Sequence, residues 1–410
     1  PAPASGMPPA DASPARIFGR FLRFGVLAFG GPVAQIAMLR RELVDEERWI
    51  YTERFNRLLA VYQVLPGPEA HELAVHLGFL RGGRLGGLLA GLGFMLPGFL
   101  LMFGLSWLYF QVDLTQAAIG SALLGAQIAV IALVGRAVVR LSEHILVDRG
   151  LVVIAVAGGI ATLAGLSFWI VLPVAGLAHV LVPRAPRGSV HLIVLGAAAA
   201  ALVAAVASTG AFALPGPVVG PPSPSAFGDP SLAEIFGSGL KAGLLTFGGA
   251  YTAIPFLRGD AVGSGWLTDA QFLDGIALGG ILPAPLIIFS TFVGYVAGGP
   301  LGAIVMTVGV FLPAFSFTLL LGDRLDAVVD NPALHRLLEG IAAGVVGLIA
   351  VTAFELALAV AARVPSALPA LVILGVALAI LFTTRARAAI PVVVGGAALA
   401  GWLLFGVIGR

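Results

Sequence analysis

The chain contains no cysteine and few charged residues. The missing cysteines exclude disulfides, thiol chemistry and metal sites built from thiolates. Only 11% of the 410 residues are charged, whereas a soluble domain carries about 25%. So few charges cannot cover a surface that faces water. The composition therefore excludes a soluble protein and predicts an integral membrane protein.

Apolar residues make up most of the chain, with 59% hydrophobic residues and a mean hydropathy of +1.02. The apolar runs are rich in alanine, leucine and glycine and show no strand-like alternation, which favours helices over a β-barrel. The net charge of +2 would suggest a nucleic-acid partner in a soluble protein. Because the arginines cluster between apolar runs, they indicate membrane topology instead, and we expect no nucleic-acid partner.

One phrase occurs twice in the sequence. FGGPVAQIAMLRRELV (29–44) and FGGAYTAIPFLRGDAV (247–262) agree at seven of sixteen positions. The likeness continues from LPGP (65–68) to LPAP (282–285), and the offset stays within 215 to 219 residues. We therefore predict a duplicated all-α membrane protein with four parts. These are a disordered tail at 1–16, a first repeat at 17–182, a linking membrane helix and Pro/Gly-rich linker at 183–233, and a second repeat at 234–410.

The hydrophobic span 190–212 has no partner in the second repeat, and this decides the topology. If each repeat crosses the membrane an even number of times, one linking helix turns the second repeat upside down. Arginine contents agree with this, because loop 81–84 has two arginines and its counterpart 297–300 has none. We predict an inverted-topology repeat of about 13 membrane segments, with the N-terminus inside and the C-terminus outside. The sequence leaves open whether the segments around FGG and LPGP span the membrane or re-enter.

The FGG phrases are expected to break helices and to build a binding site. Glycine pairs, and Pro32 in the first copy, interrupt a helix, and the helix that restarts offers free N–H groups and a dipole that favour an anion. Paired interruptions in inverted halves are a sequence sign of a transport site. Close helix packing through small residues is the alternative explanation. The candidate residues are Gly30, Gly31, Pro32, Gln35, Gly248, Gly249, Ala250 and Tyr251.

The LPGP and LPAP phrases predict two further helix starts, near Pro68 and near Pro285. The first would expose backbone N–H groups, and the second has hydroxyl side chains one turn later. Four helix N-termini could then meet at the midplane and hold a small divalent tetrahedral oxyanion without a metal or cofactor. The candidate residues here are Gly67, Pro68, Glu69, Ala70, His71, Pro285, Ser290 and Thr291.

Charged residues in apolar segments are further candidates. Arg40 and Arg258 occupy equivalent positions and would either gate the site or anchor helices at the interface. Proton coupling would need titratable groups in the membrane. Alternatively, the acidic residues at the start of the helix serve only to stabilise that helix start. The candidates for this role are Glu69, Glu72, His71, His76 and Asp274.

These motifs resemble those of the chromate ion transporter family in its long two-domain form, over about residues 17–408. The resemblance implies a bacterial inner-membrane protein that exports chromate, driven by the membrane potential or a proton gradient, with possible sulfate recognition. Ala284 departs from the family pattern, which has glycine there. The residues that match the family motifs are Phe29, Gly30, Gly31, Pro32, Pro66, Gly67, Pro68, Phe247, Gly248, Gly249, Pro283 and Pro285.

Several alternatives stay open at this point. The substrate could be sulfate or another oxyanion, the direction could be import, and a channel is possible. The chain could also form a homodimer. An intramembrane enzyme acting on lipid phosphate is disfavoured, because no HExxH or GxSxG motif is present.

Overall fold

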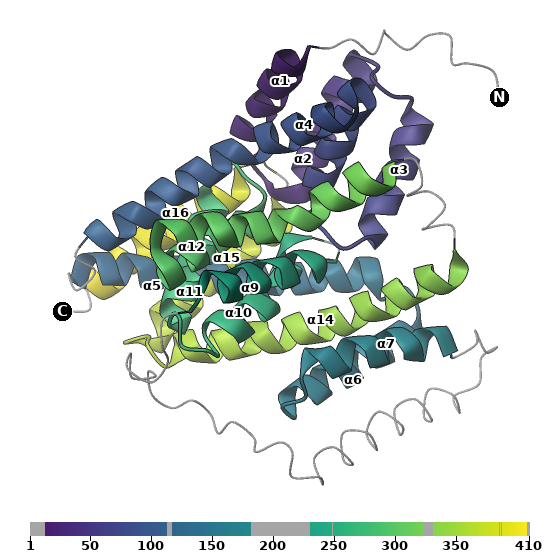
Figure 1. Ribbon diagram of the computed structural model, residues 1–410. Helices are drawn as coiled ribbons and strands as arrows, with labels where there is room; N and C mark the ends of the chain where they lie inside the picture. The colour runs from purple at the N-terminus through teal and green to yellow at the C-terminus, as the bar shows by residue number, and fades with distance from the viewer. Residues whose placement is uncertain are drawn as a thin grey trace, which may run out of the picture.

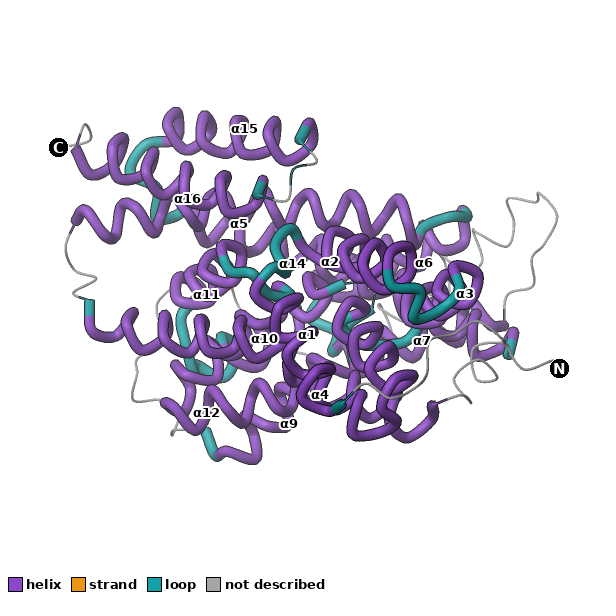
Figure 2. The backbone as a smooth tube through the Cα atoms, turned by 90° about the horizontal axis from the view of Figure 1, so that it is seen from above, coloured by secondary structure: helices purple, strands orange, loops and turns teal. Residues whose placement is uncertain are grey.

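The structure is a computed structural model, and it describes residues 13–112, 117–181, 230–247, 249–322, 331–384, 386 and 388–407. These residues form helices and loops with no strand among them (Figure 2). The span predicted at 190–212 and Gly248 lie outside the described residues. The prediction of an all-helical chain is confirmed for the part that is described.

The first half consists of short helices followed by long ones. Its elements are α1 (Pro14–Val26), α2 (Gly31–Leu39), the π-helical η1 (Arg40–Glu46), α3 (Thr52–Val64), α4 (Glu69–Gln111), α5 (Ala117–Ile145), α6 (Arg149–Leu163) and α7 (Phe168–Leu181). The first helix begins before the predicted boundary at 17, because Ser13 caps it and Pro14 occupies its first turn.

The second half repeats this order. Its elements are α9 (Leu232–Leu244), η2 (Ala250–Ala253), α10 (Ile254–Ala261), α11 (Asp269–Ile281), η3 (Leu286–Ile288), α12 (Phe289–Ser316), η4 (Phe317–Leu321), α14 (Pro332–Ala361), α15 (Ala367–Thr383), α16 (Ala389–Gly401) and η6 (Trp402–Val407). Ser231 caps α9 as Ser13 caps α1, so this half also starts slightly earlier than the predicted 234.

Among the described residues, five helical segments are long and apolar enough to cross a membrane. They are Glu69–Gln111, Ala118–Ile145, Leu286–Leu320, Pro332–Ala361 and Ala389–Val407. Three shorter apolar helices, α6, α7 and α15, accompany them. The chain is thus built as a multi-pass membrane protein.

Each half contains a helical hairpin at the segment that the sequence left open as either spanning or re-entrant. The α4 hairpin turns at Gly82 and Gly83, and its short arm (69–81) packs back on its long arm (84–111). The α12 hairpin turns in the same way at Gly298 and Gly299, with a φ of 61° at Gly299 that glycine adopts readily. Its arms are joined by a hydrogen bond of 2.7 Å between the hydroxyls of Thr291 and Thr307.

The long arms of the two hairpins cross in opposite chain directions. Gly91 of α4 lies against Phe315, and Gly87, one turn earlier in α4, lies against Leu319, one turn later in the other arm. Figure 1 shows α12 beside α4, with α14, α6 and α7 forming a second layer. Equivalent helices of the two halves therefore run antiparallel where they meet.

The long helix that follows each hairpin packs on helices of the other half. In the first half, α5 packs on α15 and α16 of the second half, as Figure 2 shows. In the second half, α14 packs on α6 and α7 of the first half. This packing buries apolar faces of the two halves against each other, so neither half forms a closed bundle alone.

The segment that follows α2 returns to the side of the bundle where α4 turns. Glu42 of η1 accepts hydrogen-bonded ion pairs from Arg20 at 2.9 Å and Arg23 at 2.8 Å. Arg81, at the turn of the α4 hairpin, stacks on the ring of Trp49 at 4.8 Å. Helices α1 and α2 therefore form a V that enters the bundle and leaves on the same side.

Candidate functional site

Both FGG phrases break a helix, as the sequence predicted. Helix α1 ends at Val26 and α2 begins at Gly31, while α9 ends at Leu244 and η2 begins at Ala250. Gly31 has a φ of 79° and Gly249 a φ of 124°. A Cβ added at either glycine would meet no atom within 4 Å. Backbone conformation, not close helix packing, is therefore the reason for glycine at these two positions.

One side chain holds each broken turn in place. Gln35, buried in α2, donates from Nε2 to the carbonyl oxygen of Ala28 at 2.8 Å. In the second half Thr252 donates to the carbonyl oxygen of Gly249 at 2.7 Å and accepts from the N–H of Phe247 at 3.0 Å. Sequence reasoning missed Thr252, although threonine side chains are known to bond the backbone carbonyl three residues earlier.

The helix starts predicted near Pro68 and Pro285 are confirmed. Helix α4 begins at Glu69 with Pro68 as its cap, and η3 begins at Leu286 directly after Pro285. The backbone N–H of His71, expected to be free, is instead donated to the carbonyl of Pro68 at 2.8 Å. The tight first turn explains this difference. The N–H groups of Glu69 and Ala70 remain as the available donors at this helix start.

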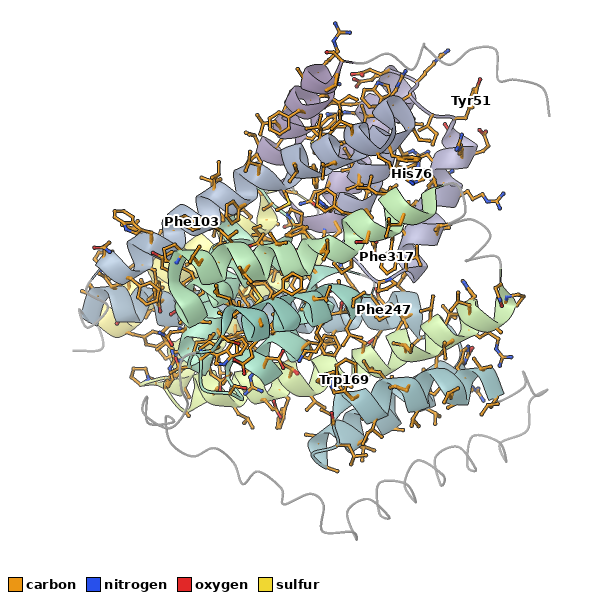
Figure 3. The ribbon with its side chains drawn as sticks, in the orientation of Figure 1. Tyr51, His76, Phe103, Trp169, Phe247 and Phe317 are labelled. Atoms are coloured by element: carbon orange, nitrogen blue, oxygen red, sulfur yellow. The ribbon has the colours of Figure 1, made fainter. Side chains whose placement is uncertain are left out.

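The breaks of the two halves meet in the interior. The N–H of Gly67 donates to the carbonyl oxygen of Thr246, directly before the second FGG phrase, at 2.7 Å. Ala284 of the LPAP phrase packs on Gly98 in the long arm of α4. Figure 3 shows Phe247 inside the bundle, where it is 4% exposed. The structure thus brings the LPGP phrase of one half to the FGG phrase of the other.

Two titratable side chains lie buried at this junction. The ring of His71 is enclosed by Phe94, Phe311 and Phe315, with centroid distances of 6.2, 4.8 and 5.0 Å. Neither ring nitrogen of His71 has a hydrogen-bond partner among the described residues, and neither has either carboxyl oxygen of Glu72. Burying such polar groups without partners is costly, which makes them candidates for binding a ligand or a proton.

Gly67 makes room for the carboxyl group of Glu72. A Cβ added at Gly67 would lie 2.6 Å from Cδ of Glu72, so any larger residue would displace that side chain. Glu69, 8% exposed, interacts electrostatically with Glu72 from the start of the same helix. The carboxyl groups therefore lie beside the contact that joins the two halves.

His76 is held in a hydrogen-bonded network. Its Nδ1 lies 2.8 Å from the hydroxyl of Tyr62, which lies 2.9 Å from Oγ1 of Thr318 in η4. Figure 3 places His76 in the region between α3 and α4. The network links α3, α4 and the second half. Tyr62 and Thr318 were not among the predicted residues, because only their position in the fold relates them to His76.

Asp274 is buried in a satisfied network away from the breaks. Its two carboxylate oxygens accept hydrogen bonds from the hydroxyl of Tyr109 at 2.8 Å and from Nε2 of Gln127 at 2.6 Å. The amide oxygen of Gln127 accepts in turn from Arg363. These partners give Asp274 a structural role that explains its burial.

The remaining predicted residues fall into two groups. Arg40 is exposed where α2 ends, whereas Arg258 is bound to Asp269 at 2.7 Å and to Glu355. Ser290 is buried with its hydroxyl unpartnered among the described residues, while Thr291 is used within the α12 hairpin. The structure thus neutralises Arg258 and leaves Arg40 at the surface.

Comparisons with known proteins agree with the duplicated fold. The family model described as chromate transporter matches residues 15–181 and 233–402. A chromate transport protein of Pseudomonas aeruginosa is 59% identical, covering 98% of this chain and 95% of its own length. A chromate transport protein of Cupriavidus metallidurans is 32% identical over 94% of this chain and 92% of its own length.

A relative from an archaeon, an uncharacterized transporter of Methanocaldococcus jannaschii, is 28% identical over 85% of this chain and 86% of its own length. No solved structure matches the chain. The family model covers both halves and most of the chain, and two relatives above 30% identity are covered almost completely. The chain is therefore a multi-pass membrane transport protein, not an enzyme, and it belongs to the chromate transporter family.

Proposed function

We propose that the protein exports chromate across the bacterial cytoplasmic membrane and binds it where the broken helices of the two halves meet. The observation that carries this proposal is the hydrogen bond from Gly67 to Thr246, which joins the helix breaks of both halves at one point. Breaks of this kind occur in transporters because free backbone groups can coordinate the substrate. The names of the Pseudomonas and Cupriavidus relatives supply the substrate.

The proposed topology is an inverted repeat with the N-terminus in the cytoplasm and the C-terminus outside. The antiparallel long arms of α4 and α12 and the opposite arginine contents of equivalent loops support it. The V of α1 and α2 and the pair formed by α3 with the short arm of α4 would then be re-entrant. If each of these re-entrant pairs counts as one segment, the chain has about 13 membrane segments. Because a re-entrant pair returns to the side from which it entered, each half still crosses the membrane an even number of times.

The membrane potential provides enough energy for export. Moving one elementary charge across 100 mV is worth about 2.3 kcal/mol, so a dianion leaving a negatively charged cytoplasm gains roughly 4.6 kcal/mol. This corresponds to about a thousandfold concentration ratio. Export of chromate therefore needs no energy source beyond the potential.

A proton at Glu72 would modify this balance. A dianion entering the junction would be repelled by an ionised Glu72, with Glu69 adding to the repulsion, whereas a protonated Glu72 would admit it. If that proton leaves with chromate, the net charge moved falls to about one, and the electrical gain falls by half. We expect the rate to fall as the pH rises, because the protonated form becomes rarer.

The proposal is tested by the uptake of labelled chromate into everted vesicles, whose outer face is the former cytoplasmic face. We expect uptake that requires an inside-positive potential and that vanishes when the potential is collapsed. Adding sulfate tests whether the second dianion competes for the site. No chromate uptake by correctly folded protein, under any potential, would contradict the proposed function.

A further inference from the structure

Two arginines on α5 have no acidic partner among the residues that the structure describes. Arg136 and Arg140 are one helical turn apart, so they share one face of α5. Neither forms an ion pair in the part of the chain that the structure describes, and Nε of the half-buried Arg136 is shielded from solvent without a hydrogen-bond partner. An arginine in a membrane span is costly unless it is paired, so an unpaired one suggests an anionic ligand.

The packing of α5 places Arg136 level with the helix breaks. Gln127 of α5 contacts Asp274 of α11, and Leu133 lies near Gly280, so the two helices run side by side in the same direction. Helix α11 ends at Ile281, just before the LPAP phrase. Since Arg136 lies one turn beyond Leu133, it reaches the depth of that phrase rather than the end of the span.

One residue of the second FGG phrase lies within electrostatic range of both arginines. Tyr251, two residues after Gly249, interacts electrostatically with both Arg136 and Arg140. Its phenol can donate a hydrogen bond, and the guanidinium groups offer several donors in a planar fork that matches oxyanions. Their combined charge of about +2 equals that of the dianion in magnitude.

We propose that Arg136, supported by Arg140 and Tyr251, forms the cationic part of the oxyanion site. This inference rests on the proposed function for the identity of the anion. Arg136 replaces Arg40 and Arg258 in the role of supplying positive charge, because Arg258 is neutralised by two carboxylates and Arg40 is exposed, whereas Arg136 is half-buried; Arg140, which supports it, is exposed. The site is asymmetric: the first half supplies the cations, and the second half supplies the broken turn.

The test compares chromate transport by three variants reconstituted in proteoliposomes. Arg136→Gln is expected to raise the chromate concentration for half-maximal rate by at least about tenfold, since a charge-assisted contact is lost. Arg136→Lys should recover part of this loss. Arg149→Gln, at an exposed arginine at the start of α6, is the matched control and should behave as wild type.

A chemical rescue separates lost charge from lost packing. Because the chain has no cysteine, Arg136→Cys carries the only thiol. Aminoethyl methanethiosulfonate attaches an ammonium group to it through a disulfide and releases a sulfinate. We expect this reagent to restore transport and its neutral methyl analogue to leave it impaired. Rescue by both reagents, or a wild-type half-maximal concentration in Arg136→Gln, would overturn the inference.

A binding assay distinguishes failure of this inference from failure of the proposed function. Chromate should raise the melting temperature of the purified wild-type protein, and at least about tenfold more chromate should be needed for the same rise in Arg136→Gln. If chromate is neither transported nor stabilising, the proposed function fails, and the same pair of proteins is tested with sulfate, molybdate and phosphate. A dianion that stabilises both proteins equally, or no stabilisation by any dianion, would overturn the arginine site.

Discussion

The two halves share a backbone and differ in chemistry. Each half has a helix that breaks at FGG, a second break at LPGP or LPAP, and a hairpin that turns at a glycine pair. In the first half the short hairpin arm carries Glu69, His71 and Glu72. The corresponding stretch of the second half begins with Leu286, Ile287, Ile288 and Phe289. Duplication has kept the conformation and changed the side chains.

The two halves also differ in whether their charged side chains have hydrogen-bond or ion-pair partners. In the second half Arg258 binds two carboxylates, and Asp274 receives two hydrogen bonds. In the first half the ionisable side chains of His71, Glu72 and Arg136 have buried polar atoms without partners among the described residues, whereas in the second half such atoms belong to the uncharged Ser238 and Ser290. Unsatisfied buried groups cost stability and usually have a functional reason. The second half therefore reads as the scaffold and the first half as the source of titratable and cationic groups.

The largest effect on transport is expected at Gly67 and its equivalent Ala284, where the two halves differ by one methyl group. Gly67→Ala forces a side chain at a φ of 156° and displaces the carboxyl group of Glu72. We expect chromate transport to fall at least about tenfold and the protein to lose roughly 1–3 kcal/mol of stability. Ala284→Gly, the matched change in the second half, should cost less than about 1 kcal/mol and keep transport. Equal losses in both variants would refute the asymmetry.

The second effect concerns coupling. In Glu72→Gln this position carries no proton, so we expect the dependence of the rate on pH to weaken to that of Glu69 alone and the charge moved per chromate to rise from about one to about two. Asp274→Asn should leave both quantities unchanged and lower stability by about 1–3 kcal/mol, because the amide places a donor against a donor. Measurements of the reversal potential and of thermal unfolding separate these outcomes. An unchanged charge in Glu72→Gln would remove it from the coupling mechanism.

A smaller difference is expected between the two equivalent arginines. Arg258→Gln leaves Asp269 and Glu355 without their cation and should lower the unfolding free energy by about 2 kcal/mol, allowing for the partial exposure of the pair. Arg40→Gln, at the surface, should change it by less than about 0.5 kcal/mol. Thermal unfolding in detergent gives both values. A larger loss of stability in Arg40→Gln than in Arg258→Gln would contradict this difference between the two arginines.

The smallest effect compares the caps of α1 and α9. Ser231 forms a capping box with Glu234, whereas Ser13 makes one hydrogen bond, to the N–H of Arg16 at 3.4 Å. We expect Ser231→Ala to cost about 1 kcal/mol and Ser13→Ala about half as much. Equal losses of stability in the two variants would show that the capping box of α9 adds nothing to the single capping hydrogen bond of α1.

The same cap predicts a dependence on pH. Hydrogen bonds from the backbone N–H and the hydroxyl of Ser231 hold the pKa of Glu234 below its usual value. Because this pKa is lowered in the folded state, the ionised Glu234 stabilises the fold at a pH above the usual carboxyl range. This stabilisation is lost as the pH falls through the pKa of the folded state. The difference between wild type and Ser231→Ala should therefore shrink in acid, and a constant difference would contradict this assignment.

Much of the fold could be predicted from the sequence. Composition identified a helical membrane protein, the repeat gave the two halves, and glycine and proline placed the breaks at FGG and LPGP. The hairpins were harder to predict, because RGGR at 81–84 reads equally well as a loop between two full spans. Only the packing of Gly78 on Gly86 and Ala90 shows that the arms fold together.

The side chains of the site were less predictable. Asp274 and Arg258 read as candidates because they are charges in apolar segments, and their partners Gln127, Tyr109 and Glu355 are distant in sequence. Arg136 was overlooked for the opposite reason, since an arginine that follows a long apolar run resembles an interfacial anchor. Its depth is visible only from the neighbouring α11.

The most direct test of the account is a structure of the protein determined by electron cryo-microscopy with chromate bound. We expect density for one tetrahedral anion at the junction of the halves, between the Gly67–Thr246 contact and Arg136, with Tyr251 beside it. Density confined to the arginines around Glu42, or to any place within a single half, would contradict the claim that chromate binds between the two unlike halves.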